Sequence, residues 1–230
     1  FNSICAQACT RGGPAVKKDP VYTSSLQLTG DARARVAPDV FVMAQRGDGS
    51  RTRYFRVTPA LLIRAASNLQ ITTDVTVEEL TNAAQFYRRF GAAASDTAHY
   101  TVARLVQSTR AVTARVSYAA TPTLSVEWYA QPFVSKGTYS GVRELDAPRA
   151  GRFEQRYKPY ADPAVTSAPG GVDFRQFRSN LVSRWEYRPG SVVYVVWSQG
   201  RDLFHDAPGT VKLSRDARIL FALTPKNTVA

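Results

Sequence analysis

The chain has 230 residues, of which 44% are hydrophobic, 11% aromatic and 21% charged, and this composition excludes a disordered chain. Its 30 Lys and Arg against 18 Asp and Glu give a formal net charge of +12, which attracts polyanions. No long basic run, zinc-ligand spacing or aromatic RNA-binding motif accompanies this charge, so no nucleic-acid partner is expected. No linker-like segment divides residues 1–230, which predicts a single domain.

Two cysteines, Cys5 and Cys9, open the chain in a segment rich in Ala, Gly and Pro. We favour a disulfide between them, which suits an oxidising compartment, and free thiols are the alternative. A metal pair would need two further ligands nearby, and none is present in the sequence around them. We therefore expect neither a metal nor a cofactor.

Alternation of apolar and polar residues with a period of two predicts β-strands along most of the chain. Turn signals separate these runs, and the clearest are RGDGS at 46–50, Thr121-Pro122 and Pro189-Gly190. We expect about ten strands of roughly 8–14 residues. Longer connections are predicted at 90–98 and 134–171, and short turns at one end with long loops at the other are typical of bacterial barrels.

Two segments favour a helix instead of a strand. Residues 76–79 resemble a capping box, and Val77, Leu80, Ala84 and Tyr87 follow helical spacing. The second segment is 215–223, which precedes Pro225. The regular spacing of the strands elsewhere excludes a doubly wound α/β fold.

The strands fit either a soluble sandwich or a transmembrane β-barrel. A sandwich would bury the apolar faces in a core, whereas a barrel would turn them to lipid and line its lumen with the charged faces. The longest wholly apolar run, 192–197, is far shorter than the roughly twenty residues of a transmembrane helix, so only a closed barrel would cross a membrane. The aromatic residues near turns favour a girdle at a membrane interface, with the candidates Trp128, Trp185, Tyr187 and Trp197.

The polar faces supply a set of candidate lumen-lining residues. They form either a basic lumen that selects anionic solutes or oligosaccharides, or a network of ion pairs that stiffens the wall. Acidic and basic residues alternate on neighbouring strands, which favours the ion pairs. The candidates are Arg56, Arg64, Asp74, Arg115, Glu127, Tyr129, Gln131, Arg184, Glu186 and Arg188.

Few residues suggest catalysis. His99 and His205 are the only histidines, and the sequence contains no GxSxG, HExxH, P-loop or GxGxxG motif. Glu127, Glu144 and Glu186 are the carboxylates that a glycosidase-like pair would use, but the sequence does not give their separation. We name no catalytic residue and favour a protein that is not an enzyme.

Three blocks of sequence carry a resemblance to a known family. They are RGGP at 11–14, TLSVEWYAQPFVSKGTYSGVRELDAP at 123–148, and NLVSRWEYRPGSVVYVVWSQGR at 180–201. The chain resembles the C-terminal domain of bacterial outer-membrane proteins that join a family-nine-like carbohydrate-binding domain to a domain of unknown function. The resemblance extends over nearly the whole chain and implies an antiparallel, up-and-down transmembrane β-barrel. It also implies that residues 1–230 are truncated at both ends and belong to a larger barrel.

The resemblance implies an outer-membrane scaffold or uptake channel in glycan handling. The expected partners are outer-membrane lipid, lipopolysaccharide, and an oligosaccharide or anionic solute. One alternative is a surface hydrolase of polysaccharide, with its active site in the 134–171 loop or in the missing N-terminal region. A second alternative is a soluble basic β-domain that binds nucleic acid.

Overall fold

The structure is a computed structural model and describes residues 3–5, 7–91 and 98–230. Its elements in chain order are β1 (Ser3–Cys5), η1 (Gln7–Thr10), β2 (Val16–Lys18), β3 (Tyr22–Thr29), β4 (Val36–Gly47), η2 (Asp48–Ser50), β5 (Thr52–Ala66), β6 (Leu69–Phe90), β7 (His99–Thr121), β8 (Leu124–Leu145), η3 (Phe153–Arg156), β9 (Tyr157–Pro159), α1 (Pro163–Thr166), β10 (Gly171–Arg188), β11 (Ser191–His205), α2 (Leu213–Ala222) and β12 (Lys226–Val229).

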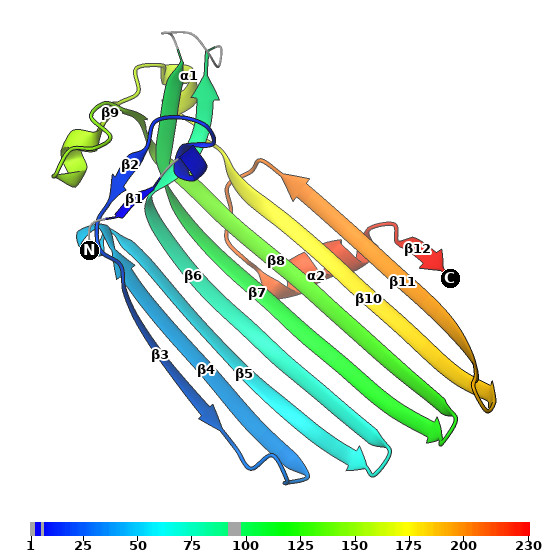
Figure 1. The fold of residues 1–230 in the computed structure, drawn as a ribbon. Coiled ribbons are helices and arrows are strands. Elements are labelled where there is room, and N and C mark those ends of the chain that lie inside the picture. Colours follow the sequence, from blue (N-terminus) through cyan, green and yellow to red (C-terminus); the bar gives the residue numbers. More distant parts are fainter. Residues whose placement is uncertain (1–2, 6, 92–97) are drawn as a thin grey trace.

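One ten-stranded antiparallel sheet dominates the molecule (Figure 1). Its order is β12-β11-β10-β8-β7-β6-β5-β4-β3, with the short β9 paired to β8, and β1 and β2 form a separate two-stranded sheet. The chain is therefore all-β and antiparallel, as the alternation predicts. The sheet does not close on itself, because β3 and β12 remain as its two edges. No helix among the described residues is long and apolar enough to cross a membrane.

The connections divide the sheet into two ends. Short turns at 67–68, 122–123 and 189–190 join strands at one end, which we call the short-turn end. The connections 48–51 and 146–170, with the ends of β6 and β7 at Phe90 and His99, lie at the other, which we call the long-loop end. The predicted turns at 46–50, 121–122 and 189–190 are confirmed. The connection predicted at 90–98 lies largely at 92–97, outside the described residues.

Six of the described strands are longer than the predicted 8–14 residues, and three of them are far longer. β6, β7 and β8 have 22, 23 and 22 residues. The helix predicted from Thr76 to Tyr87 is wrong, because β6 continues to Phe90, pairing with β5 as far as Thr81 and with β7 to its end. The loop predicted to begin at 134 is also wrong, since β8 continues to Leu145. The helix predicted at 215–223 is confirmed as α2.

The register places two kinds of side chain on opposite faces of the sheet, as the period of two requires. The face we call the apolar face carries Leu26, Val42, Leu61, Val75, Val112, Trp128, Leu181 and Val195. The face we call the polar face carries Gln27, Thr58, Asp74, Thr113, Gln131 and Asn180. The grouping of residues within each strand agrees with the sequence pattern.

No second large sheet covers the apolar face in the described part of the chain, so the two-sheet sandwich is not the fold seen. Leu26 is 56% exposed, Val75 40% and Trp185 51%. In the part of the chain that the structure describes, the buried apolar side chains form two small clusters. One lies at the long-loop end and contains Ala83, Ala84, Val102, Phe153 and Tyr157; the other lies under α2 and contains Ala130, Phe177 and Leu220.

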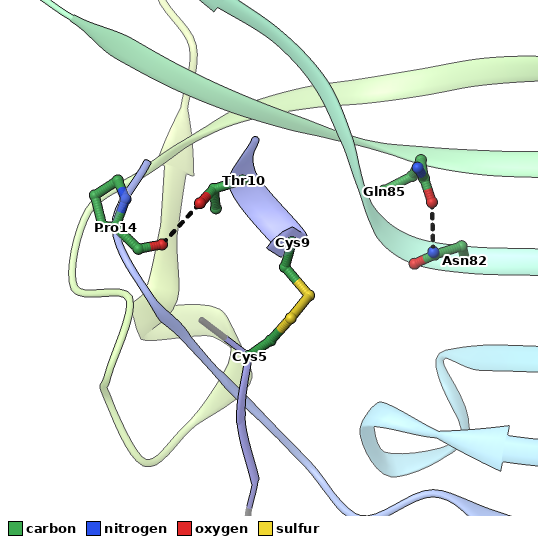
Figure 2. Close-up of a disulfide and its surroundings, with 6 residues drawn as sticks. All are labelled: Cys5, Cys9, Thr10, Pro14, Asn82 and Gln85. Carbon is green, nitrogen blue, oxygen red and sulfur yellow. Dashed lines mark hydrogen bonds between the residues drawn. A yellow bond between two sulfur atoms is a disulfide. The ribbon is translucent and has the colours of Figure 1, made fainter. Parts of the chain in front are cut away.

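The N-terminal segment folds against the long-loop end (Figure 1). Cys5 and Cys9 are joined by a disulfide with their Cα atoms 5.9 Å apart, and this closes a small loop around η1 (Figure 2). Thr10 Oγ1 donates a hydrogen bond to the carbonyl of Pro14 at 3.0 Å. The guanidinium of Arg11 lies 5.4 Å from the ring centre of Phe86 on β6, which holds the segment close to the sheet.

Candidate functional site

A cluster of polar side chains on β5 and β6 forms the centre of the polar face. The hydroxyl of Tyr54 donates a hydrogen bond to Glu78 Oε1 at 2.9 Å, and Arg56 Nε lies 3.6 Å from the same carboxylate. Arg56 Nε also donates to Thr58 Oγ1 at 3.1 Å. Arg56 was predicted from the sequence, but Glu78 was missed because it was assigned to a helix. A period of two continued through Thr76 would have placed Glu78 beside Arg56.

Neutral polar groups continue this face across β7 and β8. Gln107 Nε2 donates to Ser135 Oγ at 2.7 Å, and Thr109 and Ser135 share a hydrogen bond of 2.8 Å. Gln131 Nε2 donates to Thr113 Oγ1 at 3.3 Å. Thr109, Thr113 and Ser135 are buried. Each of these pairs satisfies polar groups that would otherwise be costly to bury.

Arginines are concentrated toward the short-turn end of the polar face. The guanidinium of Arg115 lies 4.9 Å from the ring centre of Tyr129, and Arg184 Nη2 lies 3.1 Å from Glu186 Oε2. Arg64 donates to the carbonyl of Ala34 at 3.0 Å. A cavity of about 750 Å³ at this end is lined by Arg33, Arg35, Arg64, Gln70, Ser117 and Glu127 among others.

The predicted lumen residues are thus only partly brought together. Arg184 pairs with Glu186, Arg115 stacks on Tyr129, and Arg64 lines one cavity with Glu127. In the described part of the chain, no basic side chain lies within ion-pair distance of Asp74 or Glu127. Arg188 lies beyond a register shift at the β10–β11 hairpin, apart from the rest. Among the described residues, the polar face therefore combines ion pairs, such as Arg56–Glu78 and Arg184–Glu186, with arginines such as Arg64 and Arg115 that lie near no carboxylate.

The three tryptophans all lie on the apolar face. Trp185 pairs in register with Leu124, the first residue of β8, and its ring lies 6.0 Å from Tyr187 next to the turn. Trp128 and Trp197 both pair with Leu181, about 13 Å further along the strands. Trp128 Nε1 donates to Ser179 Oγ at 2.9 Å. Only Trp185 and Tyr187 therefore lie at the turn itself, where a girdle would be.

A buried ion cluster attaches α2 to the apolar face. Arg175 donates two hydrogen bonds to Asp173, at 3.0 and 2.7 Å, and Lys136 Nζ lies 2.8 Å from Asp216 Oδ1 on α2. Burial alone would raise the pKa of Asp216, but hydrogen bonds from Lys136 and the Lys212 amide, with the charges of Lys136 and Arg175, hold that pKa below its usual value. The sequence pattern did not reveal this cluster, because its members are far apart along the chain.

The carboxylates considered for glycosidase chemistry do not form one group. Glu144 lies near the long-loop end of β8, where its Oε1 pairs with His99 Nδ1 at 2.5 Å. Glu127 lies on the same strand about 55 Å away, given the rise per residue of a strand. Glycosidase pairs are separated by about 5–10 Å. Glu127 and Glu144 therefore cannot act on one bond. No group of three metal-ligating side chains is found in the part of the chain that the structure describes.

Comparison of the chain with protein-family models, with curated proteins and with solved structures found no match.

Proposed function

We propose that this chain is part of an outer-membrane β-barrel that acts as a scaffold or uptake channel in glycan handling. In this proposal the apolar face meets lipid and the polar face lines the lumen. The glycan assignment rests on the resemblance of residues 11–14, 123–148 and 180–201 to the outer-membrane family. The assignment to a membrane rests on the geometry of the sheet.

The observation that carries the proposal is an exposed apolar band of limited height. On the apolar face it extends from 55 to 63 on β5, from 69 to 77 on β6 and from 124 to 134 on β8, where Ala130, beneath α2, and Val134 are buried. Each stretch is about nine to eleven residues long, the length that a tilted strand needs to cross a bilayer. A soluble protein that left such a band exposed would be expected to aggregate.

Charged residues end the band at one level of the sheet. Glu79, Ser108, Lys136 and Asp173 are successive partners in the register, so they form one row across four strands. Arg110 Nη2 pairs with Glu79 Oε1 at 2.5 Å beside this row. The strands continue past the row toward the long-loop end, where polar side chains are compatible with water. The row therefore marks the level at which the bilayer would end.

The burial pattern of β7 supports a lumen on the polar side. Thr109 and Thr113, on the polar face, are 8% exposed, whereas Val106 and Val112 on the apolar face are 40% and 41% exposed. We infer that the sheet curves toward its polar face, since side chains crowd on the inner side of a curved sheet. A wall with a polar inner surface and an apolar outer surface is the arrangement of a membrane barrel.

The open edges of the sheet and the position of α2 set two conditions on such a barrel. The edges β3 and β12 present unpaired backbone groups, so closure requires additional strand pairing. On the outside, α2 covers the apolar face over β8 and β10, with Leu220 buried and Phe221 49% exposed. Lipid would therefore contact α2 there rather than the sheet.

Tryptophan quenching by brominated lipids tests this proposal. The full chain is refolded into phosphatidylcholine vesicles that carry bromine at different depths of the acyl chains. Because all three tryptophans lie on the apolar face, we expect strong quenching. Variants that retain only Trp185 or only Trp128 should be quenched best at different depths, since Trp128 lies further from the turn.

A soluble fold gives the opposite result. Fluorescence that does not respond to bromine at any depth, from a chain that remains folded without detergent, would overturn the membrane assignment. Uptake activity is tested separately, by release of labelled oligosaccharides from vesicles that contain the inserted protein.

A further inference from the structure

An arginine-rich cavity opens on the apolar side of the sheet at the long-loop end. Its volume is about 1010 Å³, and its charged lining consists of Arg51, Arg53, Arg104 and Arg143 against a single carboxylate, Glu154. Arg51 pairs with Glu154. Among the described residues, no carboxylate lies within ion-pair distance of the other three arginines. The cavity therefore has an excess of positive charge.

A β-bulge turns Arg143 toward this cavity. The register passes from Arg104 opposite Ser140 to Val102 opposite Arg143, so β8 has one extra residue at this point. Gly141, at the bulge, has φ of 57°, a left-handed conformation that glycine adopts without strain. One inserted residue moves the next side chain to the opposite face. Without the bulge, Arg143 would point to the polar face.

Contacts hold Arg143 in place, whereas Arg53 and Arg104 are more exposed. Arg143 Nη2 donates to the carbonyl of Ala83 at 2.6 Å, and its guanidinium lies 4.8 Å from the ring centre of Tyr157. Burial and the nearby charge of Arg51 both lower the pKa of Arg143. Arg53 and Arg104 are exposed at the rim. Arg53 Nε donates to the carbonyl of Ser50 at 3.0 Å. An anion in the cavity would therefore meet one half-buried guanidinium and two exposed ones.

The level of the cavity indicates which anion would reach it. Arg53 pairs in register with Thr81, which pairs with Val106. This row lies two residues along β6 beyond the charged row at Glu79, and we call this interval one step. One step is about 7 Å along a strand. The cavity therefore lies just past the apolar band and on the same side, at the level of lipid headgroups under the proposed function.

We propose that this cavity binds a phosphate group, held by Arg53, Arg104 and Arg143. Guanidinium groups match the geometry of phosphate and form charge-assisted hydrogen bonds with it. The phosphate is either that of a lipid headgroup or a free phosphate ion. The lipid source rests on the proposed function, whereas the binding of phosphate itself does not.

Calorimetric titration of the full chain in non-ionic detergent tests the site. The probes are phosphatidic acid, inorganic phosphate and, as a lipid without net charge, phosphatidylcholine. We expect the double variant Arg53→Gln/Arg104→Gln to bind the phosphate probe at least about tenfold more weakly, since two charge-assisted hydrogen-bonding groups are lost. The matched control Arg149→Gln/Arg215→Gln removes two exposed arginines outside the cavity and should bind as the parent chain does.

The probes separate the two sources of phosphate. Tight binding of phosphatidic acid with weak binding of inorganic phosphate assigns the site to a lipid headgroup, and equal binding assigns it to the free ion. Equal weakening in the two double variants, or no binding of either phosphate probe, would overturn the site. The two proposals can also fail separately. If Arg53→Gln/Arg104→Gln alone loses inorganic phosphate binding, but brominated lipids do not quench the tryptophans, the phosphate site stands and the membrane assignment is rejected.

Discussion

The two ends of the sheet are built in different ways. At the long-loop end, Phe153 and Tyr157 pack into a buried cluster and Arg156 is completely inaccessible to solvent. At the short-turn end, Trp185 and Tyr187 are about half exposed, and no second layer of described residues covers them. The long-loop end is thus stabilised by contacts within the protein, as in a soluble domain. The short-turn end leaves its apolar surface exposed, and under the proposed function lipid covers it.

Arg156 illustrates how the long-loop end is held. It donates hydrogen bonds to the carbonyls of Ala150, Lys17 and Gly151, and its Nη2 lies 2.6 Å from Asp19 Oδ1. It therefore joins the N-terminal segment to the β8–β10 connection. Beside it, burial raises the pKa of Tyr157 to about 12, so this phenol remains neutral throughout the physiological range.

The largest effect is expected from Arg156→Ala. The change leaves three backbone carbonyls and the Asp19 carboxylate without their donor, which should cost about 3–5 kcal/mol. Hydrogen exchange should rise sharply over 14–19 and 146–160 but not at the turns 122–123 and 189–190. Arg152→Ala, at an exposed position in the same connection, serves as the control. Equal loss of protection at both ends of the sheet would show that they are not independent.

A charge placed in the apolar band tests whether the apolar face of the short-turn half contacts lipid. Val75→Arg should destabilise the chain in vesicles by about 2–4 kcal/mol, since a charge then faces lipid near mid-band. Thr76→Arg, on the opposite face of the same strand, should have a much smaller effect. Urea titration of the vesicle-inserted protein measures both. If Thr76→Arg proved the more damaging, the faces would be assigned the wrong way round.

The attachment of α2 should depend on pH with a defined sign. The pKa of Asp216 is lower in the folded chain than in the unfolded chain. The ionised carboxylate therefore contributes its full stabilisation of the folded state at pH values above the pKa of the unfolded chain. That contribution is lost as the pH falls through the lowered folded value. Hydrogen exchange of 213–222 should therefore increase under strongly acidic conditions.

Asp216→Asn isolates this dependence. Replacing the carboxylate removes charge-assisted hydrogen bonds and should weaken α2 docking by about 1.5–3 kcal/mol at neutral pH. Exchange over 213–222 in the variant should then vary little with acidification. Stronger protection of α2 at low pH in the parent chain would contradict the assigned role of Asp216.

The smallest effect is expected from Ser179→Ala. It removes the acceptor of the Trp128 indole N–H on the apolar face and should cost about 1 kcal/mol. Because Trp128 itself is 36% exposed, its fluorescence in vesicles should also change. Ser183→Ala, on the same face of β10, is the matched control. Equal stability of the two variants would indicate that the indole N–H finds another acceptor.

Much of the sheet could be predicted from local sequence. The alternation in 69–76 assigned Ile71 and Asp74 to opposite faces, and the Pro189-Gly190 turn ended β10 where the structure ends it. The same local reasoning failed at 77–90, where Val77, Leu80, Ala84 and Tyr87 follow helical spacing. Strand pairing decided for a strand there, because hydrogen bonds to β7, and to β5 as far as Thr81, outweigh a modest local preference.

The candidate sites show the same division. Arg56, Arg115 and Tyr129 were recognisable on the polar faces of their strands, because a period of two is a local property of the chain. The partners of Lys136 were not recognisable, since Asp173 and Asp216 reach it only through strand pairing and α2 docking. The arginine cavity depended on a single inserted residue at Gly141 that turns Arg143 to the other face.

The sequence by itself thus determined the antiparallel β architecture, the turns and the two chemically different faces. Only the tertiary structure decided how far β6 and β8 extend, where α2 lies and which charges meet. The physical reason is that side-chain alternation acts between neighbouring residues, whereas register, bulges and ion clusters arise between strands that are distant in the chain.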